Sequence, residues 1–156
     1  PMPFQDAAKV LLPISRALSY AHQQGGLHRD VKPANILIDE EGDPLLSDFG
    51  IAKILESNQA TQLTGTGVGI GTPEYMAPEQ WIGEVVPGTD IYALGIVFYE
   101  LVTGHTPFTA DTPAAILLKQ ASDPLPRPGD FVSGLPDEVE QVLFKALAIG
   151  ELCLEF

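Results

Sequence analysis

The sequence has little cysteine, few basic residues and no long apolar run, and each shortage excludes a class of protein. Its one cysteine, Cys153, can close no internal disulfide and supplies no thiolate cluster, which is typical of a reducing compartment and argues against a zinc ribbon. The longest apolar stretch, residues 91–99, is less than half of the ~20 residues that a membrane-spanning helix needs. We therefore expect no membrane span. We also expect no secretory signal, because no basic segment followed by an apolar core opens the sequence.

The shortage of basic residues argues against a nucleic-acid partner. Eight Lys and Arg stand against 21 Asp and Glu, and the resulting net charge of −13 would repel a phosphate backbone. The 156 residues are 45% hydrophobic and 19% charged, with a mean hydropathy of +0.13, which is typical of one soluble globular domain. Because the sequence starts with Pro1 instead of Met, we expect it to be part of a longer protein.

Apolar residues at helical spacing predict four helices. The first covers residues 6–24, and Pro13 within it is expected to kink or restart the helix. The second covers residues 91–102, is apolar nearly all round and is capped by Thr89 or Asp90, so it belongs in the centre of the core. Two shorter helices are expected at residues 114–121 and 137–148.

Short apolar runs separated by turn-forming residues predict small strands at residues 26–28, 36–38 and 45–47. The acidic turn at residues 39–43 joins the last two strands as a hairpin. Residues 56–71 are rich in Thr, Gly, Ser, Asn and Gln and are expected to form a long loop. The sequence therefore predicts a mainly α domain with a small β-element.

Residues 28–35 place a carboxylate, an ammonium and a side-chain amide on a tight turn after a strand. A second carboxylate, Asp48, follows the last strand of the hairpin, which would return it close to Asp30. Two carboxylates and the amide oxygen of Asn35 are hard oxygen ligands suited to Mg²⁺, and Lys32 beside them can hold a phosphate oxygen. Phosphoryl transfer needs alignment and charge neutralisation, and this set supplies both.

Four motifs stand in the order and at the spacing of one known family. They are H-R-D-V-K-P-A-N (28–35), D-F-G (48–50), G-T-P-E-Y-M-A-P-E (71–79) and D-I-Y-A-L-G (90–95). Through these motifs the sequence resembles the protein kinase superfamily, specifically the eukaryotic-like Ser/Thr kinases of bacteria, over about residues 6–148. D-F-G alone would be a weak signal, whereas the four motifs in order are specific.

The resemblance implies ATP with Mg²⁺ or Mn²⁺ as cofactors, and it implies a role for five residues. Asp30 matches the catalytic base that accepts the proton of the substrate hydroxyl, and Lys32 matches the residue that contacts the γ-phosphate and marks Ser/Thr specificity. Asn35 and Asp48 match the two metal-binding positions, and Leu37 sits where the family forms the floor under the adenine. Without the motifs, Asp30 would be interpreted as a solvated turn carboxylate and Lys32 as a surface charge. Asn35 would be interpreted as an Asx-turn amide and Leu37 as a core residue.

Four residues match supporting positions of the family. His28 and Phe49 match two rings that stack to connect the catalytic loop with the loop after it. Asp90 matches a carboxylate that holds the backbone of the catalytic loop, although an ordinary helix cap is an alternative. Arg29 would pair with a phosphate on the activation segment and order it.

Residues 48–79 resemble an activation segment. Thr64 and Thr66 stand where kinases of this class carry autophosphorylated threonines, and a polar loop without phosphorylation is the alternative. Thr72 matches the position that reaches back to the catalytic base in Ser/Thr kinases, and residues 73–79 match the platform for the substrate residue after the phosphoacceptor.

The sequence also departs from the family. No G-x-G-x-x-G, strand Lys or helix Glu precedes the first helix, so the expected fold is a protein-kinase C-terminal lobe that lacks the N-terminal β-lobe. We assign residues 1–148 to this lobe, with the catalytic loop at 28–35 and the central helix at 90–103. Residues 149–156 match nothing in the family and do not contain the Arg that is expected as the partner of Glu79.

These features predict part of a Ser/Thr protein kinase that transfers the ATP γ-phosphate to protein Ser/Thr hydroxyls and is poorly active alone, because one wall of the ATP site is missing. We expect the exposed surface of the lobe to favour association between copies of the chain or binding of a partner. We expect a cytoplasmic location, with a full-length parent that could be membrane-anchored. A non-catalytic kinase-like scaffold and a small-molecule phosphotransferase are the alternatives. The intact Asp30, Lys32, Asn35 and Asp48 argue against the first, and residues 71–79 argue against the second.

Overall fold

A computed structural model describes residues 1–49 and 72–148 of the chain. Within these ranges the protein is mainly helical with one two-stranded hairpin, as the sequence predicts. The whole of the predicted loop at 56–71, with Thr64 and Thr66 in it, and the C-terminal residues 149–156 lie outside the described ranges. In the part of the chain that is described, no helix is both long and apolar enough to traverse a lipid bilayer.

Helix α1 (Phe4–Gln23) carries one apolar stripe at helical spacing. Its buried residues are Ala7, Leu11, Ile14 and Leu18. The helix continues through Pro13, so the restart that was one of the two predicted outcomes does not occur. Pro13 lies on the exposed side of the helix. Because proline has no N–H, it cannot bond the carbonyl of Lys9, and on this side of the helix water can bond that carbonyl instead.

Helix α3 (Pro87–Thr103) is the centre of the fold, as its apolar sequence predicts. It begins three residues before the predicted start at Asp90, because Pro87 takes the first helical position and Val86 is the N-cap. The prediction that Thr89 or Asp90 is the cap is therefore wrong. The hydroxyl of Thr89 instead accepts the backbone N–H of Val86 at 3.1 Å, and Gly104, with φ of +89°, ends the helix.

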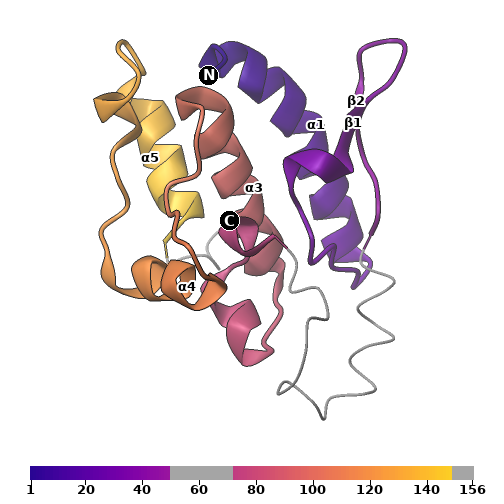
Figure 1. Cartoon of the computed structure of the whole chain (residues 1–156). Coiled ribbons are helices and arrows are strands. Elements are labelled where there is room, and N and C mark those ends of the chain that lie inside the picture. Colours follow the sequence, from indigo (N-terminus) through magenta and orange to yellow (C-terminus); the bar gives the residue numbers. More distant parts are fainter. Residues whose placement is uncertain (50–71, 149–156) are drawn as a thin grey trace.

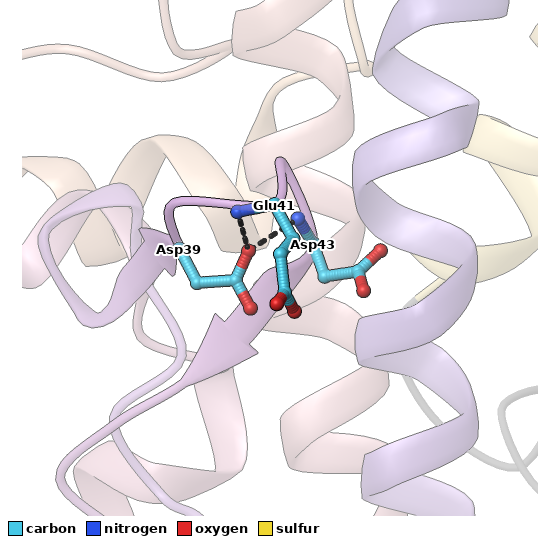
Figure 2. Close-up of side chains that lie close together, drawn as sticks. All are labelled: Asp39, Glu41 and Asp43. Carbon is cyan, nitrogen blue, oxygen red and sulfur yellow. Dashed lines mark hydrogen bonds between the residues drawn. The ribbon is translucent and has the colours of Figure 1, made fainter.

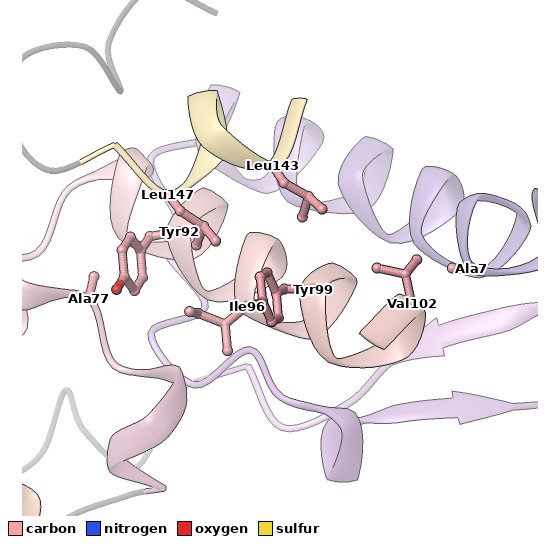
Figure 3. Close-up of a cluster of buried hydrophobic side chains, with 8 residues drawn as sticks. All are labelled: Ala7, Ala77, Tyr92, Ile96, Tyr99, Val102, Leu143 and Leu147. Atoms are coloured by element: carbon pink, nitrogen blue, oxygen red, sulfur yellow. The ribbon is translucent and has the colours of Figure 1, made fainter. Parts of the chain in front are cut away.

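Helices α1 and α5 (Asp137–Ala146) lie on either side of α3 and cover it (Figure 1). Figure 3 shows the larger buried cluster at this interface, which contains Ala7, Ala77, Tyr92, Ile96, Tyr99, Val102, Leu143 and Leu147. Each fully buried Ile or Leu side chain contributes ~1.5–3 kcal/mol to folding. The apolar groups on three helices thus fix α3 as a rigid central element.

A hairpin of β1 (Ile36–Ile38) and β2 (Pro44–Leu46) pairs antiparallel in the register Ile36↔Leu46 and packs on α1. Its turn is closed by Asp39, whose carboxylate accepts the N–H groups of Glu41 at 2.9 Å and Asp43 at 2.8 Å (Figure 2). The predicted strand at residues 26–28 does not form.

Helix α4 (Pro113–Ser122) has Thr112 as its N-cap, and the Thr112 hydroxyl accepts the N–H of Ala115 at 3.2 Å. It packs against two short 3₁₀ turns, η3 (Pro73–Tyr75) and η4 (Pro78–Ile82). Two further 3₁₀ turns, η1 (Pro33–Asn35) and η5 (Pro128–Asp130), precede β1 and α5 respectively.

Candidate active site

The backbone of the predicted catalytic loop is fixed by Asp90, in the first turn of α3. The Asp90 carboxylate is 1% exposed and accepts the backbone N–H of His28 at 2.8 Å and that of Arg29 at 2.7 Å. The ring of His22, at the end of α1, contacts the same carboxylate at 2.8 Å. Three partners offset the cost of burying this carboxylate, so the loop is tied to the central helix of the fold.

The loop brings three of the predicted site residues together. Lys32 Nζ lies 2.8 Å from Asp30 Oδ2. The amide nitrogen of Asn35 donates to the same oxygen at 3.1 Å and to the Asp30 carbonyl at 2.8 Å. The side chains of Asp30 and Lys32 are 28% and 21% exposed, so a ligand from solvent can reach them. The loop therefore presents one acceptor carboxylate beside one cation.

The hairpin carries Asp48 back towards this cluster. The N–H of Ser47, directly after β2, donates to the carbonyl of Asn35 at 2.9 Å. The Ser47 hydroxyl lies 3.2 Å both from that carbonyl and from Asp48 Oδ2. Asn35 bonds Asp30 through its amide nitrogen, so a continuous chain of contacts joins the two acidic residues. Asp48 itself has a φ of +56°, which is uncommon for a residue with a side chain.

The donor set at this place fits a hard divalent cation. Asn35 uses its amide nitrogen in both bonds to Asp30, so its amide oxygen is not used by them. Asp48 is exposed and contributes a carboxylate. Amide and carboxylate oxygens are the ligands that Mg²⁺ takes in proteins. Leu37, which we predicted under an adenine, lies on β1 and is 50% exposed.

A ring contact fixes the segment that leads to Asp48. The His28 ring is fully buried, and its Nε2 lies 2.8 Å from the carbonyl of Ser47. Phe49 contacts this ring edge to face, with centroids 4.7 Å apart. The predicted stacking of His28 with Phe49 is thus confirmed.

The predicted substrate platform, residues 73–79, is fastened to α3. The hydroxyl of Tyr75 donates to the carboxylate of Glu100 at 2.7 Å, and burial together with this bond raises the pKa of Tyr75 well above its usual range. Glu79 accepts a hydrogen bond from the hydroxyl of Thr89 at 2.8 Å, so it has a partner inside the described chain other than the expected Arg. Thr72, at the start of the platform, is exposed.

Sequence reasoning missed two glutamines at this platform. Gln80 lies on η4 and bonds both the platform and the catalytic loop, and Gln120 reaches the platform from α4. Gln80 stands two residues after Pro78, at the position where a capping box places Glu or Gln, so its spacing is a signal that could have found it. No motif or spacing singles out Gln120. His22 was missed as well, although it is the nearest histidine outside the catalytic loop in the sequence.

A second group of acidic residues lies at the hairpin turn. The carboxylates of Asp39, Glu41 and Asp43 approach within 4.8 Å of one another (Figure 2). Glu41 and Asp43 are exposed, and Asp39 already binds two backbone N–H groups of its own turn. Turn closure accounts for Asp39 without a bound cation.

Comparison with known proteins agrees with the motifs. The family model described as protein kinase domain matches residues 1–145. The chain is 40% identical over 149 residues to the serine/threonine-protein kinase PknL of Mycobacterium tuberculosis, which covers 95% of this chain and 37% of PknL. It is 41% identical over 145 residues to the probable serine/threonine-protein kinase PknB of Bifidobacterium longum, which covers 92% of this chain and 21% of that protein.

A third relative is the DNA damage-responsive serine/threonine-protein kinase RqkA of Deinococcus radiodurans, 43% identical over 135 residues, or 86% of this chain and 20% of RqkA. The chain thus spans less than two-fifths of the length of these relatives. The family match covers most of the chain, and all four ordered motifs lie within it. The chain therefore belongs to the protein kinase domain family and is similar to the eukaryotic-like serine/threonine kinases of bacteria.

Proposed function

We propose that this chain is the C-terminal lobe of a Ser/Thr protein kinase, which transfers the γ-phosphate of ATP to Ser or Thr hydroxyls of proteins. The observation that supports this most strongly is the convergence of Asp30, Lys32 and Asn35, with contacts of 2.8 and 3.1 Å, on a loop bonded to the buried Asp90. Kinase chemistry relies on positioning and charge, and this loop provides both.

In this proposal Asp30 is the base. Its carboxylate would accept the proton of the substrate hydroxyl as the oxygen attacks phosphorus, and the cation of Lys32 would face the transferring phosphate. Asn35 and Asp48 would hold Mg²⁺ or Mn²⁺, which neutralises charge on the phosphates when it is bound. The hydrogen bond from Asn35 to Asp30 Oδ2 would keep the Asp30 side chain oriented before substrate arrives.

Two parts of the proposal concern the nucleotide and the substrate. Leu37 would lie under the adenine, and its 50% exposure on β1 leaves an apolar surface for that contact. Thr72 would approach the catalytic base beside the bound peptide, and residues 73–79 would receive the residue after the phosphoacceptor. Thr64 and Thr66 remain proposed phosphorylation sites, with Arg29 as the proposed partner of the phosphate.

Identification of the phosphorylated atom tests this function. The complete gene product is incubated with Mg-ATP and a mixture of unfolded proteins, and the products are analysed by mass spectrometry. The proposal predicts phosphate on Ser and Thr side chains. Phosphate only on a small molecule would favour the small-molecule phosphotransferase. No ATP-dependent modification of any acceptor would favour a non-catalytic scaffold and would reject the proposal.

Self-association also stays a prediction. An apolar groove of about 810 Å³ runs between α1, α3 and α5 and is lined by Leu12, Phe98 and Val142 among others. Leu12 and Val142 are each more than half exposed. Exposed apolar surface of this kind favours association in water. Sedimentation velocity across a range of protein concentrations measures it, and a single monomeric species at all concentrations would contradict the prediction.

A further inference from the structure

Two glutamine side chains hold the two polar groups of one peptide bond, the bond between Met76 and Ala77. Gln120, on α4, donates its amide N–H to the carbonyl of Met76 at 3.1 Å. Gln80, on η4, accepts the N–H of Ala77 on its amide oxygen at 2.9 Å. The carbonyl and the N–H belong to the same planar unit, so the orientation of that plane is fixed from both sides.

The surroundings make these bonds costly to lose. Ala77 is fully buried, and Gln120 is 1% exposed. A buried peptide group without partners loses about 1–3 kcal/mol for each unsatisfied atom. Figure 3 shows Ala77 next to Tyr92 of α3, so the clamped peptide lies against the central helix. Because Ala77 has no exposed surface, water cannot replace Gln80 as the partner of its N–H.

The side chain of Gln80 makes a second bond, which reaches outside the platform. Its amide nitrogen donates to the backbone carbonyl of Arg29 at 3.1 Å. Arg29 has a φ of +68° and directly precedes Asp30. A positive φ on a residue with a side chain persists only where the surroundings hold it. One side chain thus bonds both the platform peptide and the strained residue next to the proposed base.

We infer that Gln80 and Gln120 are positioning residues that set the substrate platform in register with Asp30. This inference rests on the proposed kinase function. Residues 73–79 would hold the substrate peptide, and Asp30 must meet its hydroxyl within hydrogen-bond reach. Hydrogen bonds run from α4 through the peptide 76–77 and Gln80 to Arg29. Together they fix the position of the platform relative to Asp30. An error of about 1 Å in such an offset can cost ~100-fold in rate.

Core packing alone does not require this arrangement. A methionine of similar volume would fill the space of either glutamine, but it would bond neither the peptide 76–77 nor the Arg29 carbonyl. The bond from Gln80 to Arg29 joins two segments 51 residues apart in the chain. This bond therefore fixes the position of the catalytic loop relative to the platform, which packing within either segment does not determine.

Three substitutions in the complete gene product separate the bonds. Gln120→Met removes the bond to the Met76 carbonyl, and Gln80→Met removes both bonds of Gln80. Gln80→Glu keeps an acceptor for the Ala77 N–H but removes the donor to Arg29. Gln141→Met, at an exposed position on α5, is the matched control. Each variant is assayed for transfer to a peptide, for ATP hydrolysis by water, and for amide exchange at Ala77.

The inference predicts that each of the three variants lowers kcat/KM for the peptide by about tenfold while ATP hydrolysis by water stays within about twofold. Exchange at Ala77 should accelerate in Gln80→Met and remain slow in Gln80→Glu. The double variant Gln80→Met with Gln120→Met should lose less than the product of the single losses, because both act on one peptide unit. Gln141→Met should match the unaltered protein in every assay.

Two results would overturn the inference alone. One is an active unaltered protein whose three variants retain its kcat/KM for the peptide. The other is an equal loss of peptide transfer and ATP hydrolysis in proportion to lost stability, which indicates a structural role only. If the unaltered protein transfers phosphate to no Ser or Thr, the proposed function fails and the inference fails with it.

Discussion

The carboxylate of Asp90 accepts the backbone N–H of Arg29 at 2.7 Å, across 61 residues of sequence. Asp90 is 1% exposed and lies on the central helix, whereas Arg29 lies on the loop that carries the proposed base. The central helix of the fold therefore holds the backbone next to Asp30. Catalytic groups need this kind of support from a rigid scaffold, because small displacements cost large factors in rate.

Replacement of this carboxylate should loosen the loop. Asp90→Asn keeps the size of the side chain but turns one acceptor oxygen into an N–H donor, which leaves a buried backbone N–H unpaired. We expect a loss of about 2–4 kcal/mol in the free energy of unfolding. Denaturant unfolding measures the loss, and amide exchange should accelerate at His28 and Arg29. Asp111→Asn, at an exposed position, is the control. Unchanged exchange at both amides would contradict the role given to Asp90.

The contact between α3 and α5 should tolerate no side chain at Gly95. A Cβ at this position would lie 2.9 Å from Leu147 Cδ2 and 3.0 Å from Ala146 Cβ. Gly95→Val forces the two helices apart, and we expect a destabilisation of about 1–3 kcal/mol, measured by thermal or denaturant unfolding. Ala114→Val, exposed on α4, adds comparable bulk without a contact and should change stability much less. Equal effects of the two substitutions would show that the helices do not approach as described.

Stability should depend on pH through Glu140. The hydrogen bond from Arg127 at 2.8 Å, and then the one from the N–H of Gly129, lower the pKa of Glu140 below its ordinary value of 4.5. A lowered pKa in the folded state stabilises the protein above the unfolded pKa, and this stabilisation is lost as the pH falls through the folded value.

The test compares Glu140→Gln with the unaltered protein at several pH values. The Tm of the variant should be lower at pH 7, and the difference should shrink steadily below about pH 4.5, where the glutamate becomes protonated. Glu138→Gln, exposed on the same helix, should show no such trend. A Tm difference that is constant from pH 7 to pH 3 would mean that the charge of Glu140 contributes nothing.

Local patterns in the sequence predicted most of the elements. Apolar spacing located α1, α3, α4 and α5, and the run of turn-forming residues between two apolar segments located the hairpin. The boundary errors have local causes. Pro87 starts α3 earlier than the cap pattern suggested, and Pro13 lies on the solvent side of α1, where the fold tolerates it.

The site was predicted in part. The motifs located Asp30, Lys32 and Asn35 on one loop, and the structure shows that both Lys32 and Asn35 contact Asp30. The supports from Gln80 and Gln120 were not predicted, because they depend on which main-chain groups become buried, and a single sequence does not report that. The segment at 26–28 was predicted as a strand from its apolar residues, but no partner strand pairs with it among the described residues.

Phosphate transfer by site variants of the complete gene product tests the central claim most directly. The claim is that Asp30 and Asp48 act at one phosphoryl-transfer site, whereas the acidic hairpin turn does not. With Mg-ATP and a peptide whose Ser or Thr hydroxyl the unaltered protein phosphorylates, Asp30→Asn and Asp48→Asn should each lower kcat by at least about 100-fold. Asp43→Asn, in the acidic turn, should leave kcat unchanged. Wild-type rates in Asp30→Asn, or a loss confined to Asp43→Asn, would contradict the account.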